Sequence, residues 1–248
     1  MMPRWLAYLI VLAVLAAGAG LAFASLDMNW NWEVVWEYRA AFWKGWWMTV
    51  GLSLAALVAS SLIGVVAALM LRSSFTLLQA AARVYVELVR GTPLLVQLLI
   101  GWYVIAAALR AGNDHRYGVG VLVLSLFSGA YMAEIFRSGL DAIPKTQLDS
   151  ARAIGLTPWQ SLRLVVLPQA VRIVLPSVAG QLVSLIKDSS LLSVISIAEF
   201  TFAARNVNSA TYSTLESYLP LAAGYLALTL PLSALSRWLE RRFRYEAA

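Results

Sequence analysis

Two adjacent residues of opposite charge, Lys187 and Asp188, lie inside a long apolar stretch and precede Ser189 and Ser190. Placing a charge at the centre of a bilayer costs about 2.5–3.5 kcal/mol on insertion scales, so these residues are expected to face a helix-bundle interior or water. Neighbouring residues on a helix point about 100° apart, so the two cannot form a simple facing pair. They either pair with other polar groups for structural reasons or line a polar pathway, to which the serines would add hydroxyl groups.

Glu134 and Arg137 form a second charged pair near the end of another apolar stretch. Their i, i+3 spacing places them on one helix face, where they can form an ion pair, and Glu134 is also a candidate for the polar pathway. A third group has i, i+4, i+7 spacing and predicts a charged stripe along one helix, for which a solvated face is the default interpretation. This group is Arg83, Glu87 and Arg90.

Residue types that usually carry metal or redox chemistry are scarce. The chain has no cysteine and a single histidine, His115, so thiolate metal sites and disulfides are excluded, and neither a metal site nor a catalytic residue is predicted. The motif G-x-x-x-x-G-K-[ST] is absent from the sequence, so the chain is not expected to bind ATP by a phosphate-binding loop. No cofactor is therefore assigned to it.

The elements that must position these residues are membrane-spanning helices. Of the 248 residues, 60% are hydrophobic and only 13% are charged, which is too apolar for a soluble globular chain. Several apolar stretches are long enough to cross a hydrocarbon core of about 30 Å, and they lack the alternation of barrel strands. We predict an all-α integral membrane protein with about six transmembrane helices, at Trp5 to Leu26, Trp46 to Leu71, Leu94 to Leu109, Val119 to Phe136, Val171 to Ile197 and Tyr218 to Ser236.

The distribution of positive charge predicts the orientation. Most of the 19 Lys and Arg residues flank the spans on one side, as in cytoplasmic loops, and this bias accounts for the net charge of +6 without a nucleic-acid partner. Both termini are then cytoplasmic if the first span is retained as an anchor, which is the preferred interpretation, although residues 22–24 also resemble a signal-peptide cleavage site. Residues 1–45 form an N-terminal span and a Trp-rich segment on the outer membrane surface. Residues 46–248 form the main transmembrane domain.

The longest polar insertion, about residues 138–169, lies on the cytoplasmic side. Thr146 with Asp149 predicts a helix start, and Gly155 predicts a helix end in the left-handed conformation. Residues 157–160 predict a second helix, with Thr157 as its cap and proline in its first position. By local pattern alone, this helix–turn–helix is either an amphipathic elbow on the lipid headgroups or a docking element.

Within this insertion, the order Asp149-Ser150-Ala151, Gly155 and Leu167-Pro168 resembles the EAA motif of ABC-transporter permease subunits. From about Thr49 to Arg242 the chain is similar to the polar amino acid uptake permeases of the histidine, glutamate and glutamine type. Asp149 and Ser150 stand where the motif usually has Glu and Ala, and the first span is extra to the common five-helix core. The stretches that carry the wider resemblance are Glu87 to Gln97 (ELVRGTPLLVQ), Ala133 to Gly139 (AEIFRSG), Val166 to Ala170 (VLPQA) and Lys187 to Leu191 (KDSSL).

The resemblance implies a role for the loop and for the charged residues. The loop would be a coupling helix that inserts into a groove on a cytoplasmic ATPase. Its coupling residues would be Asp149, Ser150, Ala151, Gly155, Leu167 and Pro168. The substrate pathway would be lined by Glu134, Lys187, Asp188, Ser189 and Ser190.

The resemblance also implies a function and partners. The chain would be the permease subunit of a binding-protein-dependent importer of polar amino acids, acidic or amide ones first, in a bacterial inner membrane, and would not itself be an enzyme. Its partners would be an ABC ATPase dimer that uses ATP and Mg²⁺, a second permease subunit (a copy or a paralogue), a periplasmic or extracellular amino-acid-binding protein and membrane lipid. The alternative is an amino acid carrier driven by an ion gradient. It would use the intramembrane charges as a relay but would leave the helix–turn–helix without a role.

Overall fold

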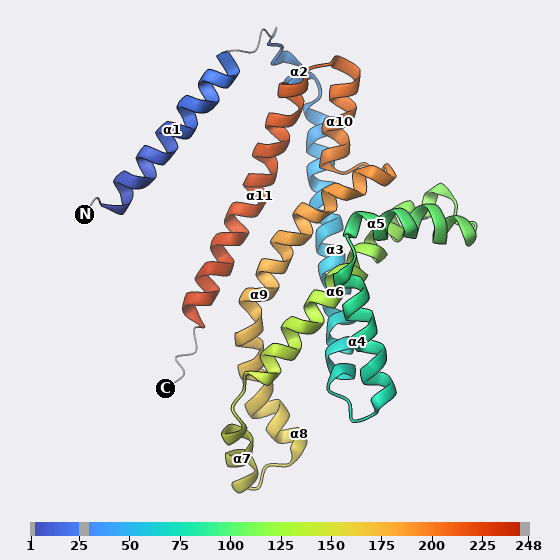
Figure 1. Ribbon diagram of the computed structural model, residues 1–248, viewed down its shortest axis with the longest axis vertical. Coiled ribbons are helices and arrows are strands. Elements are labelled where there is room, and N and C mark those ends of the chain that lie inside the picture. Colours follow the sequence, from blue (N-terminus) through green and yellow to red (C-terminus); the bar gives the residue numbers. More distant parts are fainter. Residues whose placement is uncertain (1–2, 25–29, 244–248) are drawn as a thin grey trace.

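A computed structural model describes residues 3–24 and 30–243 of the chain. Throughout these residues the regular elements are helices, as the apolar pattern predicts (Figure 1). Four helical segments of the described chain are long and apolar enough to cross a membrane. They contain α3 (Arg39–Leu71), α6 (Arg116–Asp141), α9 (Leu167–Asp188) and α11 (Thr214–Arg242).

The third expected span differs from its prediction. It is not a separate straight helix but the second arm of a bent pair: α4 (Thr76–Gly91) is followed by α5 (Leu94–Leu99) and a π-helical segment, η1 (Ile100–Ala106), at 106° to it. The bend lies at Thr92, which is extended with φ −121° and ψ 142°. The cause is Pro93, whose ring disfavours helical geometry in the residue before it.

The remaining helices lie at the two ends of the bundle or outside it. α1 (Arg4–Ala24) is the first expected span and stands apart from the other helices in Figure 1. α7 and α8 protrude at one end, and α2 and α10 lie at the opposite end (Figure 1). The shorter elements are α2 (Glu33–Glu37), η2 (Asn113–His115), α7 (Lys145–Ala153), α8 (Pro158–Ser161), η3 (Leu162–Val166), η4 (Ser189–Ile195) and α10 (Phe200–Thr211).

The most extensive helix pair is α3 with α6, which pack along much of their length. Glycines allow this approach: a Cβ atom at Gly64 of α3 would overlap Met132 of α6, and one at Gly129 would lie 2.7 Å from Cγ2 of Ile63. Small residues at a helix interface let two backbones come close, which is a main source of attraction between helices in lipid. α3 and α6 therefore form a closely packed central unit that carries the charged residues of α6.

A buried carboxylate organises the end of the bundle opposite α7 and α8. Glu199 is fully buried and accepts hydrogen bonds from Thr49 Oγ1 at 3.3 Å and Tyr225 OH at 3.1 Å. It also caps α10 by accepting from the backbone N–H groups of Thr201 and Phe202. Burial raises the pKa of Glu199 above its ordinary value, and these hydrogen bonds oppose the rise. One side chain thus joins α3, α10 and α11.

Candidate functional site

The protruding loop begins after the C-terminal end of α6. α7 starts at Lys145, directly after Pro144, and no side chain caps it. Pro144 has φ −59° and ψ 138°, so its extended backbone separates α7 from α6 and α7 begins at the next residue. The prediction that Thr146 is the N-cap is therefore wrong. Asp149 pairs instead with Arg152, at 3.6 Å, one turn further along α7.

The turn after α7 follows its prediction. Gly155 has a φ of +81°, the left-handed conformation that favours glycine. Its N–H donates to Arg152 O at 2.9 Å, and Leu156 N–H donates to Ala151 O at 3.0 Å, which closes the helix end.

The second helix of the loop is also capped as predicted. Thr157 Oγ1 accepts from Gln160 N at 3.3 Å, and Gln160 Oε1 accepts from Thr157 N at 2.8 Å, with Pro158 in the first turn. This capping box satisfies donors that the helix start would otherwise leave free. The chain then passes through the π-helical segment η3 into α9, which begins at Leu167 and Pro168.

The loop has its own small core and an apolar tip. Ile143, Val166 and Ala170 are buried together, and Leu148 packs against them. At the tip, by contrast, Ile154 is 77% exposed and Trp159 is 68% exposed. Exposed large apolar side chains on a well-ordered element indicate a contact surface for another protein or for lipid. The sequence analysis did not select Ile154 and Trp159 as functional residues. Their apolar side chains flank a turn in a polar insertion, and this position is a signal for a contact surface.

The coupling residues inferred from the resemblance occupy different environments. Asp149, Ser150 and Gly155 are exposed, whereas Ala151 is buried and supports the packing of α7. Leu167 is half exposed where α9 begins. The exposed members are thus available for contact with a partner.

The charged pair Lys187 and Asp188 lies at the C-terminal end of α9, where the 3₁₀ segment η4 begins. Lys187 is exposed, Asp188 is half-buried, and neither forms an ion pair with any other residue in the described ranges. Ser189 is buried and donates to Ile186 O at 2.8 Å, while Ser190 donates to Lys187 O at 2.6 Å. Their hydroxyl protons are therefore already used by the backbone, and only their oxygen lone pairs remain for a ligand.

Glu134 is not brought together with these residues. It lies two turns before the end of α6, whereas Gly139, in the last turn of α6, packs against Val174 of α9, 13 residues before Lys187. At 1.5 Å per residue, those 13 residues of helix span about 20 Å. The five pathway residues predicted from the sequence thus fall into two groups, with Glu134 on α6 and the other four where α9 ends and η4 begins.

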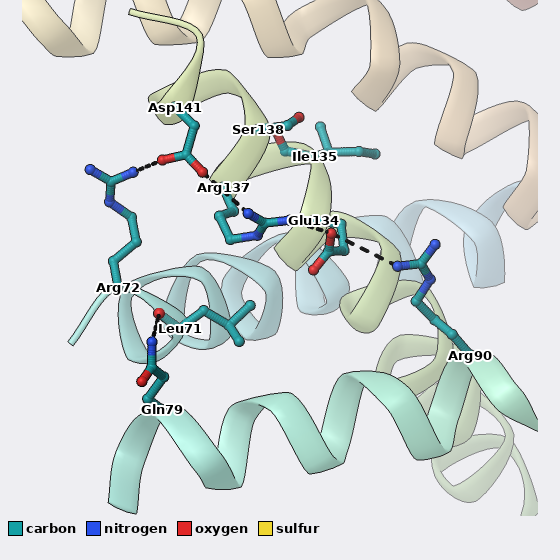
Figure 2. Close-up of polar contacts among 9 residues, drawn as sticks. All are labelled: Leu71, Arg72, Gln79, Arg90, Glu134, Ile135, Arg137, Ser138 and Asp141. Carbon is teal, nitrogen blue, oxygen red and sulfur yellow. Dashed lines mark hydrogen bonds and ion pairs between the residues drawn. The ribbon is translucent and has the colours of Figure 1, made fainter. Parts of the chain in front are cut away.

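Glu134 belongs to a chain of charges that connects the last turns of α6 with the end of α3 and the last turn of α4 (Figure 2). It accepts from Arg137 at 2.8 Å, as its spacing predicts, and Arg137 also contacts Asp141 at 3.2 Å. Asp141 pairs with Arg72, directly after α3, and Arg90 of α4 lies 3.9 Å from Glu134. These charged residues line a polar cavity of about 410 Å³. The i, i+4 spacing of Arg137 and Asp141 is a signal in the sequence for their ion pair. No spacing in the sequence indicates the contacts with Arg72 and Arg90.

Gln97 braces the bend between α4 and α5. Its Nε2 lies 2.8 Å from Val89 O, 3.2 Å from Thr92 O and 2.8 Å from Thr92 Oγ1. The side chain thus satisfies carbonyl groups that the end of α4 leaves without partners. Sequence reasoning treated the bend only as a break in the helix and missed this role.

An apolar helix bundle with a structured loop protruding at one end defines an all-α integral membrane protein. The chain belongs to the family of binding-protein-dependent transport system inner membrane components, whose profile matches residues 60–245. This confirms the resemblance to ABC permeases drawn from the sequence. Membership in this family does not favour a carrier driven by an ion gradient.

Individual relatives cover most of the chain. The glutamine transport system permease protein GlnP of Escherichia coli K12 is 32% identical over 217 residues, which cover 88% of this chain and 99% of that protein. The glutamate/aspartate import permease protein GltK of Escherichia coli O6:H1 is 33% identical over 202 residues, 79% of this chain and 90% of that protein. A chain in a crystal structure of an amino acid ABC transporter with histidines is 36% identical with a TM-score of 0.79, covering 87% of this chain and all of that chain.

Proposed function

We propose that this chain forms the translocation pathway of an ATP-driven importer of polar amino acids, with acidic and amide amino acids as the leading substrates, in a bacterial inner membrane. Relatives named for glutamine and for glutamate/aspartate transport support the substrate class. The observation that carries the proposal is the self-packed loop, which keeps Ile154 and Trp159 exposed at its tip. Such a tip is suited to a groove on a separate ATPase subunit.

The loop is placed to transmit motion because it connects α6 directly to α9. The exposed Asp149, Ser150 and Gly155 contact the ATPase, Ala151 holds α7 on the loop core, and Leu167 with Pro168 starts α9. Closure of the ATPase dimer on ATP and Mg²⁺ displaces the loop, and α6 and α9 follow as rigid bodies. Access to the pathway switches from one side of the membrane to the other.

The pathway residues lie on α6, on α9 and at the start of η4, which directly follows α9. Lys187 and Asp188 together present an ammonium and a carboxylate, which suit the carboxylate and the ammonium of an amino acid. Ser189 and Ser190 support the end of α9 through their bonds to the backbone. Glu134 acts at the inner end, next to the loop.

The assembly would contain two ATPase subunits, a second permease subunit (a copy or a paralogue) and an external amino-acid-binding protein. Residues 1–45 act as an additional anchor with a surface segment, residues 46–248 form the permease domain with the coupling loop at about 138–169, and both termini are cytoplasmic. Three exposed tryptophans near the start of α3 support an interfacial position for this segment, because indole rings favour the headgroup region. They are Trp36, Trp43 and Trp47.

Affinity purification of the tagged chain in mild detergent, followed by mass spectrometry, tests the proposal. We expect an ATPase with a phosphate-binding loop to co-purify, and amino acid uptake by the reconstituted assembly to require ATP. A chain that purifies alone and carries amino acids without ATP contradicts the proposal.

Gly155→Asp tests the role of the loop. It adds a charge at the exposed turn and is expected to abolish ATPase association and uptake while the protein remains inserted. Gly155→Asn is the control for backbone strain, since asparagine tolerates the left-handed conformation. Gly112→Asp makes the same change at a glycine that has open space around it and a negative φ of −69°. Normal ATPase association in Gly155→Asp would refute the coupling role.

A further inference from the structure

The polar cavity between the C-terminal end of α3, the length of α4 and the C-terminal part of α6 is lined by charges of both signs. Four arginines and three acidic residues face it, so no single sign dominates. Its volume of about 410 Å³ falls in the range of about 300–1,000 Å³ that is typical of small-molecule sites. The cavity is close to the coupling loop, because Asp141 on its wall is followed after three residues by Lys145, the first residue of α7.

The α6 wall of the cavity is already neutralised. Arg137 bridges Glu134 and Asp141, and Asp141 also pairs with Arg72 (Figure 2). These four residues carry two positive and two negative charges and satisfy one another. This wall is therefore a fixed framework and has little capacity to bind an additional charge.

The α4 wall, by contrast, has free binding capacity. Arg83 and Glu87 both face the cavity, and no hydrogen bond or ion pair engages either side chain in the part of the chain that the structure describes. Residues four apart lie about 5–6 Å from each other on a helix face. Arg90, one turn further on, is only partly engaged: it stacks 5.2 Å from the ring centroid of Tyr131 and lies 3.9 Å from Glu134.

We propose that this cavity binds a free amino acid as a zwitterion on the inner side of the membrane, with its carboxylate on Arg83 and Arg90 and its ammonium group on Glu87. A ligand with only a carboxylate would leave Glu87 unpaired, and a ligand with only an ammonium group would face two arginines. Discrimination against both follows from these unpaired charges. A phosphatidylethanolamine headgroup shares the pairing of anion and ammonium, so the test must separate the two sources.

This site rests on the proposed function, because an importer releases its amino acid on the side of the coupling loop. Amino acid bound on the α4 wall fills the space between α4 and α6, the helix that leads into α7. Occupancy therefore resists the displacement of the loop, and amino acid that accumulates inside slows the next transport cycle.

Equilibrium binding of radiolabelled L-glutamine and L-glutamate to the purified full-length chain in detergent tests the site. Arg83→Gln and Glu87→Gln are each expected to weaken binding about tenfold, the loss of one charge-assisted hydrogen bond. Glutaramate, which lacks the α-amino group, and 4-aminobutanamide, which lacks the carboxylate, are expected not to compete. Arg237→Gln and Glu240→Gln remove matched charges from the inner end of α11 and are expected to leave binding unchanged.

The consequence for transport is tested in proteoliposomes of the assembled transporter, with ATP inside. For each variant, the readout is the ratio of the uptake rate in vesicles loaded with the amino acid to the uptake rate in empty vesicles. Loading is expected to lower the uptake rate of the wild-type transporter. In Arg83→Gln and Glu87→Gln, loading is expected to leave the uptake rate unchanged. If wild-type uptake requires ATP but is insensitive to loading, this inference fails and the proposed function stands; if no ATP-driven uptake occurs, the proposed function fails. Binding of phosphatidylethanolamine to the chain, with no binding of glutamine or glutamate, assigns the cavity to lipid and overturns the inference.

Discussion

Gln97 holds the bend between α4 and α5 through a single amide group. Its Nε2 contacts Val89 O and both oxygen atoms of Thr92. Gln97→Leu keeps the size of the side chain but removes the donor to the part-buried Val89 carbonyl and to the exposed Thr92 oxygens, and the loss of a hydrogen bond costs about 0.5–1.5 kcal/mol. We expect a lower thermal unfolding midpoint in detergent. Gln79→Leu, which removes one longer bond of 3.3 Å to Leu71 O, is the matched control and is expected to have a smaller effect.

Single residues were predictable from the sequence where both partners lie within one turn. The capping box of Thr157 and Gln160, the left-handed Gly155 and the pair of Glu134 with Arg137 all depend on spacings of four residues or fewer. Arg72 and Asp141 are 69 residues apart and meet only because α3 and α6 pack closely. No local pattern encodes such a contact.

At the scale of helices, the α3–α6 unit depends on glycine at particular positions. Gly64→Ala places a Cβ against Met132, so we expect destabilisation of about 1–3 kcal/mol from overpacking. Gly51→Ala makes the same change in the same helix where nothing lies within 4 Å, and the better helix propensity of alanine is expected to make it neutral or stabilising by up to about 1 kcal/mol. Thermal unfolding of both variants in one detergent measures the difference. Equal midpoints would show that the close approach at Gly64 does not limit stability.

The spans themselves were largely predictable because apolar length is a direct property of the sequence. Four of the six predicted spans correspond to long apolar helices of the described chain. The angle between α4 and α5 was not predictable, because Pro93 signals a break but does not specify its direction. That direction depends on Gln97 and on the packing of Tyr85, whose OH donates to Leu126 O of α6 at 2.6 Å.

At the scale of the whole molecule, the exposed tip of the loop between α6 and α9, which we propose to be a coupling loop, predicts where a partner docks. Trp159→Ala removes a large side chain that is 68% exposed, so the fold should be unchanged, whereas an aromatic anchor at an interface often contributes enough for an approximately tenfold loss of affinity, about 1.4 kcal/mol or more. We expect weaker co-purification of the ATPase with an unaltered thermal midpoint. Trp36→Ala, at a tryptophan that is 72% exposed at the opposite end, is the control and should retain the ATPase.

The π-helical segment η3 lies between α8 and α9, where the loop between α6 and α9 ends. A π-helical turn contains one more residue than an α-helical turn and is usually an isolated insertion. Deleting one residue from Leu162–Val166 would restore α-helical winding and turn the loop by about 100° about the axis of α9. The direction in which Ile154 and Trp159 point is thus set by the winding of the connecting helix. The residues that make up this docking surface and the direction in which the surface faces are separate properties of the chain. A single insertion or deletion in the connecting helix changes the direction and leaves the residues of the surface unchanged.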